Sequence, residues 1–175
     1  MTLSIDGRVV LPVKSLIVLY SYHHNNTAKI ASVFARVLDA HIMTPRQTDS
    51  EELQKYDLIG FGSGIYSSNV HEDLLEFANK LPQTPNGKAF LFSTSGAPVF
   101  FERYSSYRVT YAHECHTLLR EKLQFKGYKI LGEFSCAGHN TNSFLKLFGG
   151  INKGRPNIQD LKDAEEFALN MKQSF

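Results

Sequence analysis

The segment with the most evident chemistry is the run from Ser21 to Thr27, Ser-Tyr-His-His-Asn-Asn-Thr, which holds hydroxyl, imidazole and amide groups and no carboxylate. It lies between an apolar run typical of a buried strand and a segment with helical spacing. The unpaired backbone N–H groups and the dipole of a helix N-terminus favour an anion at such a position. We therefore expect a phosphate site here. The alternative is that Asn26 or Thr27 only caps the helix.

Two side chains in the middle of this run, His23 and His24, can donate hydrogen bonds to a bound phosphate or stand in solvent, and the sequence leaves both possibilities open. A second pair, His113 and His116, has i, i+3 spacing, but no HExxH motif or nearby carboxylate–cysteine set completes a metal site. We expect this second pair on a solvated helix face.

The elements that must position the first loop alternate along the whole chain. Apolar runs predict five strands, and segments with helical spacing or N-terminal capping residues predict five helices. We expect the third helix to begin near Asn69, one helix to span residues 110–123, and Asn157 to cap the last helix. The strands are expected at residues 14–20, 40–43, 57–62, 88–93 and 129–136.

This alternation implies a single α/β domain over residues 1–175 with a parallel sheet and right-handed crossovers. Residues 1–13 form an N-terminal extension, in which Asp6 and Gly7 suggest a short hairpin. Parallel sheets bind ligands beyond the carboxyl ends of their strands. We therefore expect the site just after Tyr20, Gly62 and Ser93.

Residues 20–31, Tyr-Ser-Tyr-His-His-Asn-Asn-Thr-Ala-Lys-Ile-Ala, resemble the phosphate loop of the flavodoxin family. Thr27 and Ala31 match that pattern, whereas Tyr22 and Asn25 stand where the family usually has a hydroxyl residue and a small residue. Asparagine tolerates left-handed backbone geometry, so Asn25 can take the place of the glycine.

Two later segments extend the resemblance to nearly the whole chain. Residues 62–71, Gly-Ser-Gly-Ile-Tyr-Ser-Ser-Asn-Val-His, are similar to the loop after the third strand in flavodoxin-like proteins, especially the flavodoxin-like protoporphyrinogen oxidases. Residues 93–101, Ser-Thr-Ser-Gly-Ala-Pro-Val-Phe-Phe, resemble the loop after the fourth strand. The resemblance implies a flavodoxin-like three-layer doubly wound sandwich with a five-stranded parallel sheet in the order 2-1-3-4-5.

The resemblance also implies non-covalently bound FMN, with these two loops flanking the isoalloxazine ring. Tyr66 and Phe100 or Phe101 are the candidates for stacking on that ring; alternatively, Tyr66 lies at the rim and the phenylalanines pack in the core. Gly62, Gly64 and Gly96 would allow the backbone to approach a planar ligand or a peptide to flip. The predicted cofactor-binding residues are Ser21, Tyr22, His23, His24, Asn25, Asn26, Thr27, Ser63, Gly64, Ile65, Tyr66, Thr94, Ser95, Gly96 and Phe100.

Composition excludes several other classes of protein. The formal net charge is only +2 and no dense basic block occurs, so nucleic acid is not an expected ligand. The apolar runs are too short to cross a membrane, and we expect a cytoplasmic protein. Cys115 and Cys136 match no metal or CxxC spacing and are expected to be buried. The three loops hold no catalytic triad, carboxylate pair or nucleophile.

These observations predict an FMN protein that acts in electron transfer or as a small flavin-dependent oxidoreductase. Flavodoxin carriers are typically acidic, whereas this sequence has a pI near 8.5. We therefore expect a different partner, such as a quinone or another small acceptor, a redox enzyme or an iron–sulfur protein. The main alternative is a cofactor-free flavodoxin fold that serves as a binding scaffold. A receiver domain fits poorly, since Asp57 lies at the start of its strand.

Overall fold

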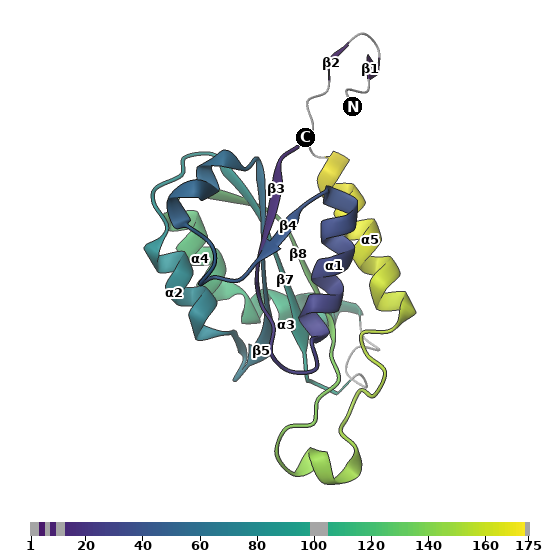
Figure 1. Ribbon diagram of the computed structural model, residues 1–175. Coiled ribbons are helices and arrows are strands. Elements are labelled where there is room, and N and C mark those ends of the chain that lie inside the picture. Colours follow the sequence, from purple (N-terminus) through teal and green to yellow (C-terminus); the bar gives the residue numbers. More distant parts are fainter. Residues whose placement is uncertain (1–3, 6–7, 10–12, 99–104, 174–175) are drawn as a thin grey trace.

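The computed structural model describes residues 4–5, 8–9, 13–98 and 105–173 (Figure 1). Phe100 and Phe101, two of the candidates for stacking on a ring, lie outside these residues. Near the N-terminus, β1 (Ser4–Ile5) and β2 (Arg8–Val9) pair in antiparallel fashion, which confirms the expected short hairpin. Within the described part of the chain, no helix has the length and apolar character needed to cross a membrane.

The main sheet has five parallel strands in the spatial order β4-β3-β5-β7-β8. Numbered along the chain, this is the predicted order 2-1-3-4-5. A sixth strand, β6, pairs in antiparallel fashion with the end of β5. The bounds are β3 Ser15–Tyr20, β4 His41–Met43, β5 Leu58–Tyr66, β6 Asn69–Val70, β7 Gly87–Ser95 and β8 Tyr128–Ala137.

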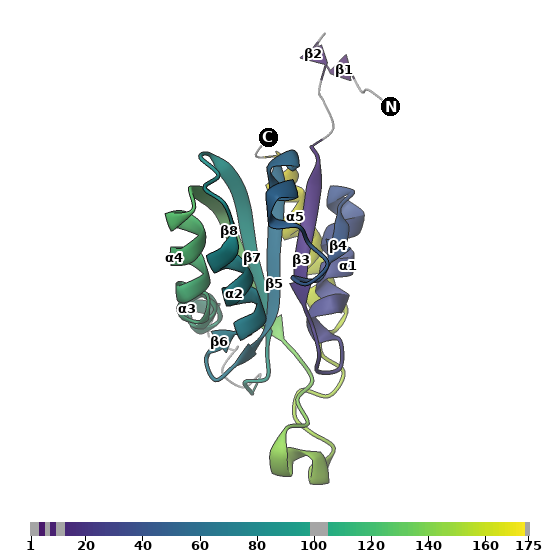
Figure 2. The same cartoon turned by 60° about the vertical axis from the view of Figure 1, so that its left-hand side comes forward.

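Helices cover both faces of the sheet and make the predicted three-layer sandwich (Figure 2). The helices α1 and α5 pack on one face, and α2, α3 and α4 lie on the other. In the described part of the chain, the 3-10 helices η1 and η3 lie in the connections. The bounds are α1 Asn26–Leu38, η1 Ser50–Lys55, α2 Glu72–Lys80, α3 Ser105–Cys115, α4 Thr117–Phe125, η3 Ser143–Phe148 and α5 Ile158–Gln173.

Each face of the sheet has its own apolar core, and glycines in β5 make room for aromatic rings on the face covered by α1 and α5. Gly62 lies opposite Phe92 of β7 in register, and a Cβ atom built on Gly62 would stand 2.0 Å from the Cζ atom of Phe92. The structure thus gives a core-packing reason for the glycine at this position. The absence of a side chain there accommodates a core phenylalanine.

The third helix begins later than predicted. The strand β5 continues past Gly62 to Tyr66, and Asn69 pairs with Tyr66 in the returning strand β6. The turn between them, Ser67–Ser68, has φ angles of 47° and 63°. The helix α2 starts at Glu72, and the side chain of His71 caps it. Asn69 is thus a strand residue, because a hairpin extends the sheet before the helix.

The segment predicted as one helix over residues 110–123 is two helices that break at His116. His116 is completely buried, and its Nδ1 atom lies 3.0 Å from Oε2 of Glu133 on β8. The expectation of a solvated face was therefore wrong for His116, because this contact draws the chain toward the sheet. The capping role of Asn157 is confirmed, since its Oδ1 atom accepts the backbone N–H groups of Gln159 and Asp160. The buried environment expected for Cys115 and Cys136 is also confirmed.

Candidate functional site

A concavity that is partly open to solvent lies at the carboxyl edge of the sheet, where the three predicted loops meet. Most of the predicted cofactor-binding residues line it: Ser21, Tyr22, His23, Asn26, Thr27, Gly64, Ile65, Tyr66, Thr94, Ser95 and Gly96. The carboxyl-edge rule of parallel sheets thus located the concavity correctly.

The backbone of the first loop bends sharply before α1. Asn25 has φ 51° and ψ 31°, which confirms the left-handed geometry expected at this position, and His24 has φ 52°. Asn25 precedes the helix without making a side-chain cap. In the described part of the chain, the backbone N–H groups of His24, Asn25 and Thr27 donate to no protein acceptor. Such unpaired N–H groups at a helix N-terminus are the usual ligands of an anion.

The side chains expected to cap α1 have other roles. The hydroxyl group of Thr27 is buried and lies 2.7 Å from the hydroxyl group of Thr94, which joins the first loop to the end of β7. The Ser21 hydroxyl oxygen accepts the backbone N–H of Ala28 at 3.2 Å. These bonds fix the loop against the sheet and leave the backbone N–H groups of His24, Asn25 and Thr27 unpaired.

Asn26 carries a buried acceptor without a partner. Its side chain is only 6% exposed, and Nδ2 donates to the backbone carbonyl of His139 at 2.9 Å. The Oδ1 atom is buried and has no hydrogen-bond partner in the structure. An unsatisfied buried acceptor costs free energy unless a ligand or water donates to it. A hydroxyl-bearing ligand in the concavity would satisfy it.

The ring of Tyr66 lies between the second loop and the first. It folds over Gly64, where a Cβ atom would stand 3.1 Å from the ring and from the hydroxyl oxygen. Burial, with smaller contributions from Tyr20 and Tyr22, raises the pKa of Tyr66, while a hydrogen bond from the backbone of His23 acts in the opposite direction. Tyr66 is therefore half-buried, lines the concavity and contacts the first loop directly.

Three predicted residues lie beside the concavity without lining it. Ser63 is buried behind it, and its hydroxyl group donates to the Gly64 carbonyl and accepts the His71 N–H. Asn25 forms the left-handed turn before α1 through its backbone and makes no side-chain cap. The His24 side chain turns outward and lies 2.8 Å, Nε2 to Oγ1, from Thr141.

A fourth segment, missed in the sequence, completes the concavity. His139, Asn140 and Asn142 follow the end of β8 and line it together with the first three loops. Asn140 donates from Nδ2 to the Gly96 carbonyl at 3.3 Å. The signal was present, because β8 is also a parallel strand whose carboxyl end reaches the same edge. The same rule therefore indicates this segment as well as the first three loops.

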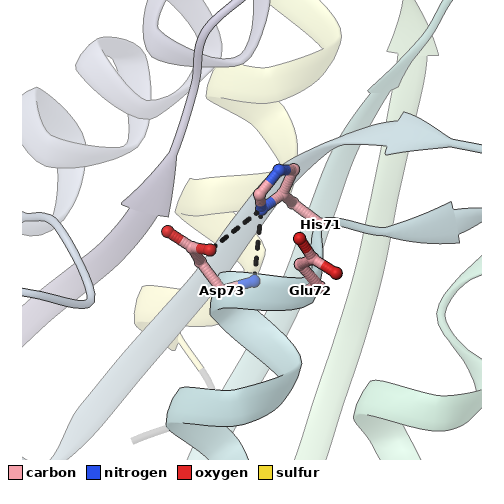
Figure 3. A group of neighbouring side chains, drawn as sticks. All are labelled: His71, Glu72 and Asp73. Carbon is pink, nitrogen blue, oxygen red and sulfur yellow. Dashed lines mark hydrogen bonds and ion pairs between the residues drawn. The ribbon is translucent and has the colours of Figure 1, made fainter.

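A separate group, His71, Glu72 and Asp73, brings possible metal-ligand atoms within 4.8 Å of one another (Figure 3). The Nδ1 atom of His71 already accepts the backbone N–H of Asp73 at 3.2 Å, and Asp73 Oδ1 lies 3.7 Å from it. Figure 3 shows both of these contacts running to Asp73 and none to Glu72. The arrangement is a helix cap in which Asp73 engages Nδ1 of His71.

The residues of the concavity fit a phosphate ester that also carries hydroxyl groups and a flat ring. Unpaired N–H groups suit the phosphate, the Asn26 acceptor suits a hydroxyl, and Tyr66 offers an aromatic surface. FMN has these three parts. No nucleophile or general base faces the concavity in an arrangement that suggests covalent catalysis, as far as the described residues extend.

Known proteins resemble this chain over most of its length. It is 44% identical over 158 residues to an uncharacterised protein from Methanocaldococcus jannaschii, and the alignment covers 90% of this chain and 97% of the relative. Among solved structures, oxidised flavodoxin 2 from Bacillus cereus matches with a TM-score of 0.66 and 19% identity, covering 93% of this chain and 99% of that one. A Fusobacterium nucleatum flavodoxin bound to flavin mononucleotide matches with a TM-score of 0.62 and 12% identity, with the same coverage.

The structural matches, at such low identity, establish the fold. A match in sequence supports the assignment independently, since residues 17–127 fit the family described as the flavodoxin domain. That segment is more than half of the 175 residues and contains the first three loops of the concavity. The predicted resemblance to the flavodoxin family is thereby confirmed, and the chain belongs to the flavodoxin domain family.

Proposed function

We propose that this protein binds FMN non-covalently in the concavity and acts in electron transfer or as a small flavin-dependent oxidoreductase. The observation that carries the proposal is the first loop, whose left-handed turn leaves backbone N–H groups unpaired at the start of α1. A site that binds a phosphate monoester should bind FMN more tightly than riboflavin, because riboflavin lacks the phosphate group.

Each part of the concavity has a role in this proposal. The backbone N–H groups of His24, Asn25 and Thr27 would hold the phosphate, and Asn26 Oδ1 would accept a hydrogen bond from a hydroxyl of the ribityl chain. Tyr66 would give the ring an aromatic surface. FMN supplies the redox chemistry when bound, and the protein binds, orients and shields it.

The charge of the protein indicates which kind of redox partner it would bind. The pI near 8.5 and the absence of any Asp or Glu from residues 138–157, which border the concavity, favour an anionic partner or acceptor. A quinone or other small acceptor remains compatible with the open concavity. An acidic redox protein, such as an iron–sulfur protein, fits the charge better.

Flavin fluorescence titrations test the proposal. We expect one FMN per chain, bound at least about tenfold more tightly than riboflavin, because charge-assisted hydrogen bonds to the phosphate contribute about 1.5–3 kcal/mol each. Equal affinities for FMN and riboflavin would contradict the phosphate site. A folded protein that binds neither flavin would favour the cofactor-free scaffold.

A matched pair of variants at one position isolates the loop geometry. Asn25→Gly permits φ 51° and should keep the preference for FMN, whereas Asn25→Val disfavours this conformation and should reduce it. Both variants should stay folded by circular dichroism. If Asn25→Val keeps the full preference, the left-handed turn is not what forms the phosphate site.

A further inference from the structure

The segment that leaves β8 and returns to α5, residues 138–157, projects beyond the carboxyl edge of the sheet (Figures 1 and 2). We call it the arm. Asn140 and Ile151 pair across it in antiparallel fashion, and η3 forms its tip. At its base, Arg155 makes a bidentate ion pair with the buried Asp160, with distances of 2.5 and 2.6 Å. The arm is therefore a folded element that is anchored at its base.

The arm is attached to the first loop by side chains from both segments. The rings of His24 and His139 stack with centroids 4.5 Å apart. Nε2 of His24 lies 2.8 Å from the Thr141 hydroxyl oxygen, and His23 Nε2 contacts Asn142 Oδ1. These contacts join positions more than 110 residues apart in the sequence. The first loop and the arm thus form two walls of one concavity.

This junction concentrates groups that are positive when protonated. His23 of the first loop, Lys29 of α1 and His139 of the arm all act electrostatically on His24, and Tyr66 of β5 lines the concavity together with His23 and His139. Among the described residues, no carboxylate forms an ion pair with these four basic groups. Partial burial first, and then repulsion from His139, His23 and Lys29, lowers the pKa of His24. An anion between the two walls would relieve this repulsion.

The chemistry of His139 suits a role as an anion ligand. Its Nε2 atom donates to the Gly149 carbonyl at 3.2 Å, so a second proton on Nδ1 makes the ring a cation. Its backbone carbonyl accepts from Asn26, whose Oδ1 atom is the buried acceptor without a partner. His139, a residue of the arm, therefore both lines the concavity and contacts the first loop.

We propose that the arm is a latch for the phosphate group of the cofactor, with His139 as a phosphate-binding residue that holds the arm on the first loop when the anion is bound. The inference rests on the proposed function, since the anion is the phosphate of FMN. Riboflavin would fill the ring subsite and leave the latch open.

Limited proteolysis of the full-length protein tests the latch. Trypsin can cleave after Lys146 and Lys153, both exposed on the arm, and mass spectrometry follows these two cuts separately from all others. A ligand at ten times its dissociation constant that holds the arm closed should slow these cuts about tenfold. We expect FMN and inorganic phosphate to do so, and riboflavin to have no effect.

Two variants and a matched control assign the effect to His139. His139→Ala should abolish the protection by phosphate and weaken FMN binding about tenfold, as the loss of a hydrogen bond to a charged group predicts, without changing riboflavin binding. His139→Gln, which keeps a donor, should restore part of both effects. His41→Ala replaces an exposed histidine on β4 and should behave as wild type.

The outcomes separate this proposal from the proposed function. FMN binding without protection of the arm, or an unchanged preference for FMN in His139→Ala, overturns the latch and leaves the proposed function intact. Protection by inorganic phosphate in a protein that does not bind FMN supports the latch and overturns the proposed cofactor.

Discussion

Glu133 is a largely buried carboxylate on β8 whose pKa lies well below the ordinary value. Burial alone raises its pKa, but hydrogen bonds from His116 and Arg120 and their charges outweigh burial and lower it to about 2. Arg120 Nε lies 2.6 Å from Oε1, and His116 Nδ1 lies 3.0 Å from Oε2. This network ties the junction of α3 and α4 to β8, the strand that leads into the arm.

Replacing this carboxylate should destabilise the protein in a pH-dependent way. A carboxyl group whose pKa is lowered on folding contributes stability that is present above its unfolded pKa and is lost as pH falls toward 2. Glu133→Gln should therefore lower the free energy of unfolding by about 3 kcal/mol at pH 7, an order-of-magnitude figure. The difference in unfolding free energy between the variant and wild type should shrink as pH falls from about 5 to about 3. Urea denaturation at a series of pH values across this range measures it.

The control for this prediction is Glu121→Gln, which removes an exposed carboxylate from α4 and should change stability by less than about 0.5 kcal/mol. A constant difference between Glu133→Gln and wild type from pH 7 to pH 3 would show that the carboxylate charge does not stabilise the fold.

At the scale of the elements, β5 both forms the centre of the sheet and supplies a wall of the concavity. Its glycines lie against phenylalanine rings of β7, Gly60 against Phe90 and Gly62 against Phe92. Beyond them the strand continues as a hairpin with β6, which carries Tyr66 to the first loop. Packing of the glycines against the rings therefore affects the position of the hairpin.

Gly62→Ala tests this packing. The added Cβ atom would stand 2.0 Å from Phe92 Cζ, so the strands must shift, and we expect a loss of stability of about 1–3 kcal/mol. The double variant Gly62→Ala/Phe92→Leu should lose less than the sum of the two single variants in chemical denaturation. Additive losses would mean that the glycine and the ring do not compete for this space.

At the scale of the whole molecule, the concavity is built from segments that span the sequence from Ser21 to Asn142. Its walls are the first loop, the ends of β5 and β7, and the arm. A ligand that contacts all of them stabilises only the folded state. Binding should therefore appear as an increase in global stability.

FMN should raise the thermal unfolding midpoint. At 100 times its dissociation constant it should add about 2.7 kcal/mol, which corresponds to about 5–10 °C for a chain of this size. Riboflavin at the same concentration should raise the midpoint less, because it lacks the phosphate. Dye-based differential scanning fluorimetry, supported by circular dichroism, measures these unfolding midpoints. No change with FMN in a folded protein would contradict the proposed cofactor.

The sequence alone determined the features that depend on near neighbours. Strands and helices follow from periodic apolar residues, and the left-handed turn at Asn25 follows from an asparagine that stands where the resembled phosphate-loop pattern has a small residue. The parallel order of the strands then brought the loops after β3, β5 and β7 to one edge. These inferences needed only local patterns and the rules of parallel sheets.

The tertiary structure alone decided which distant side chains meet. The stacking of His24 on His139, the burial of His116 against Glu133, and the ring of Phe92 over Gly62 join residues far apart in the sequence. Local periodicity does not encode such pairs, because each depends on how two separate elements pack in three dimensions. For that reason the left-handed turn before α1 could be predicted from its own residues, while the contacts that the arm makes with the first loop could not.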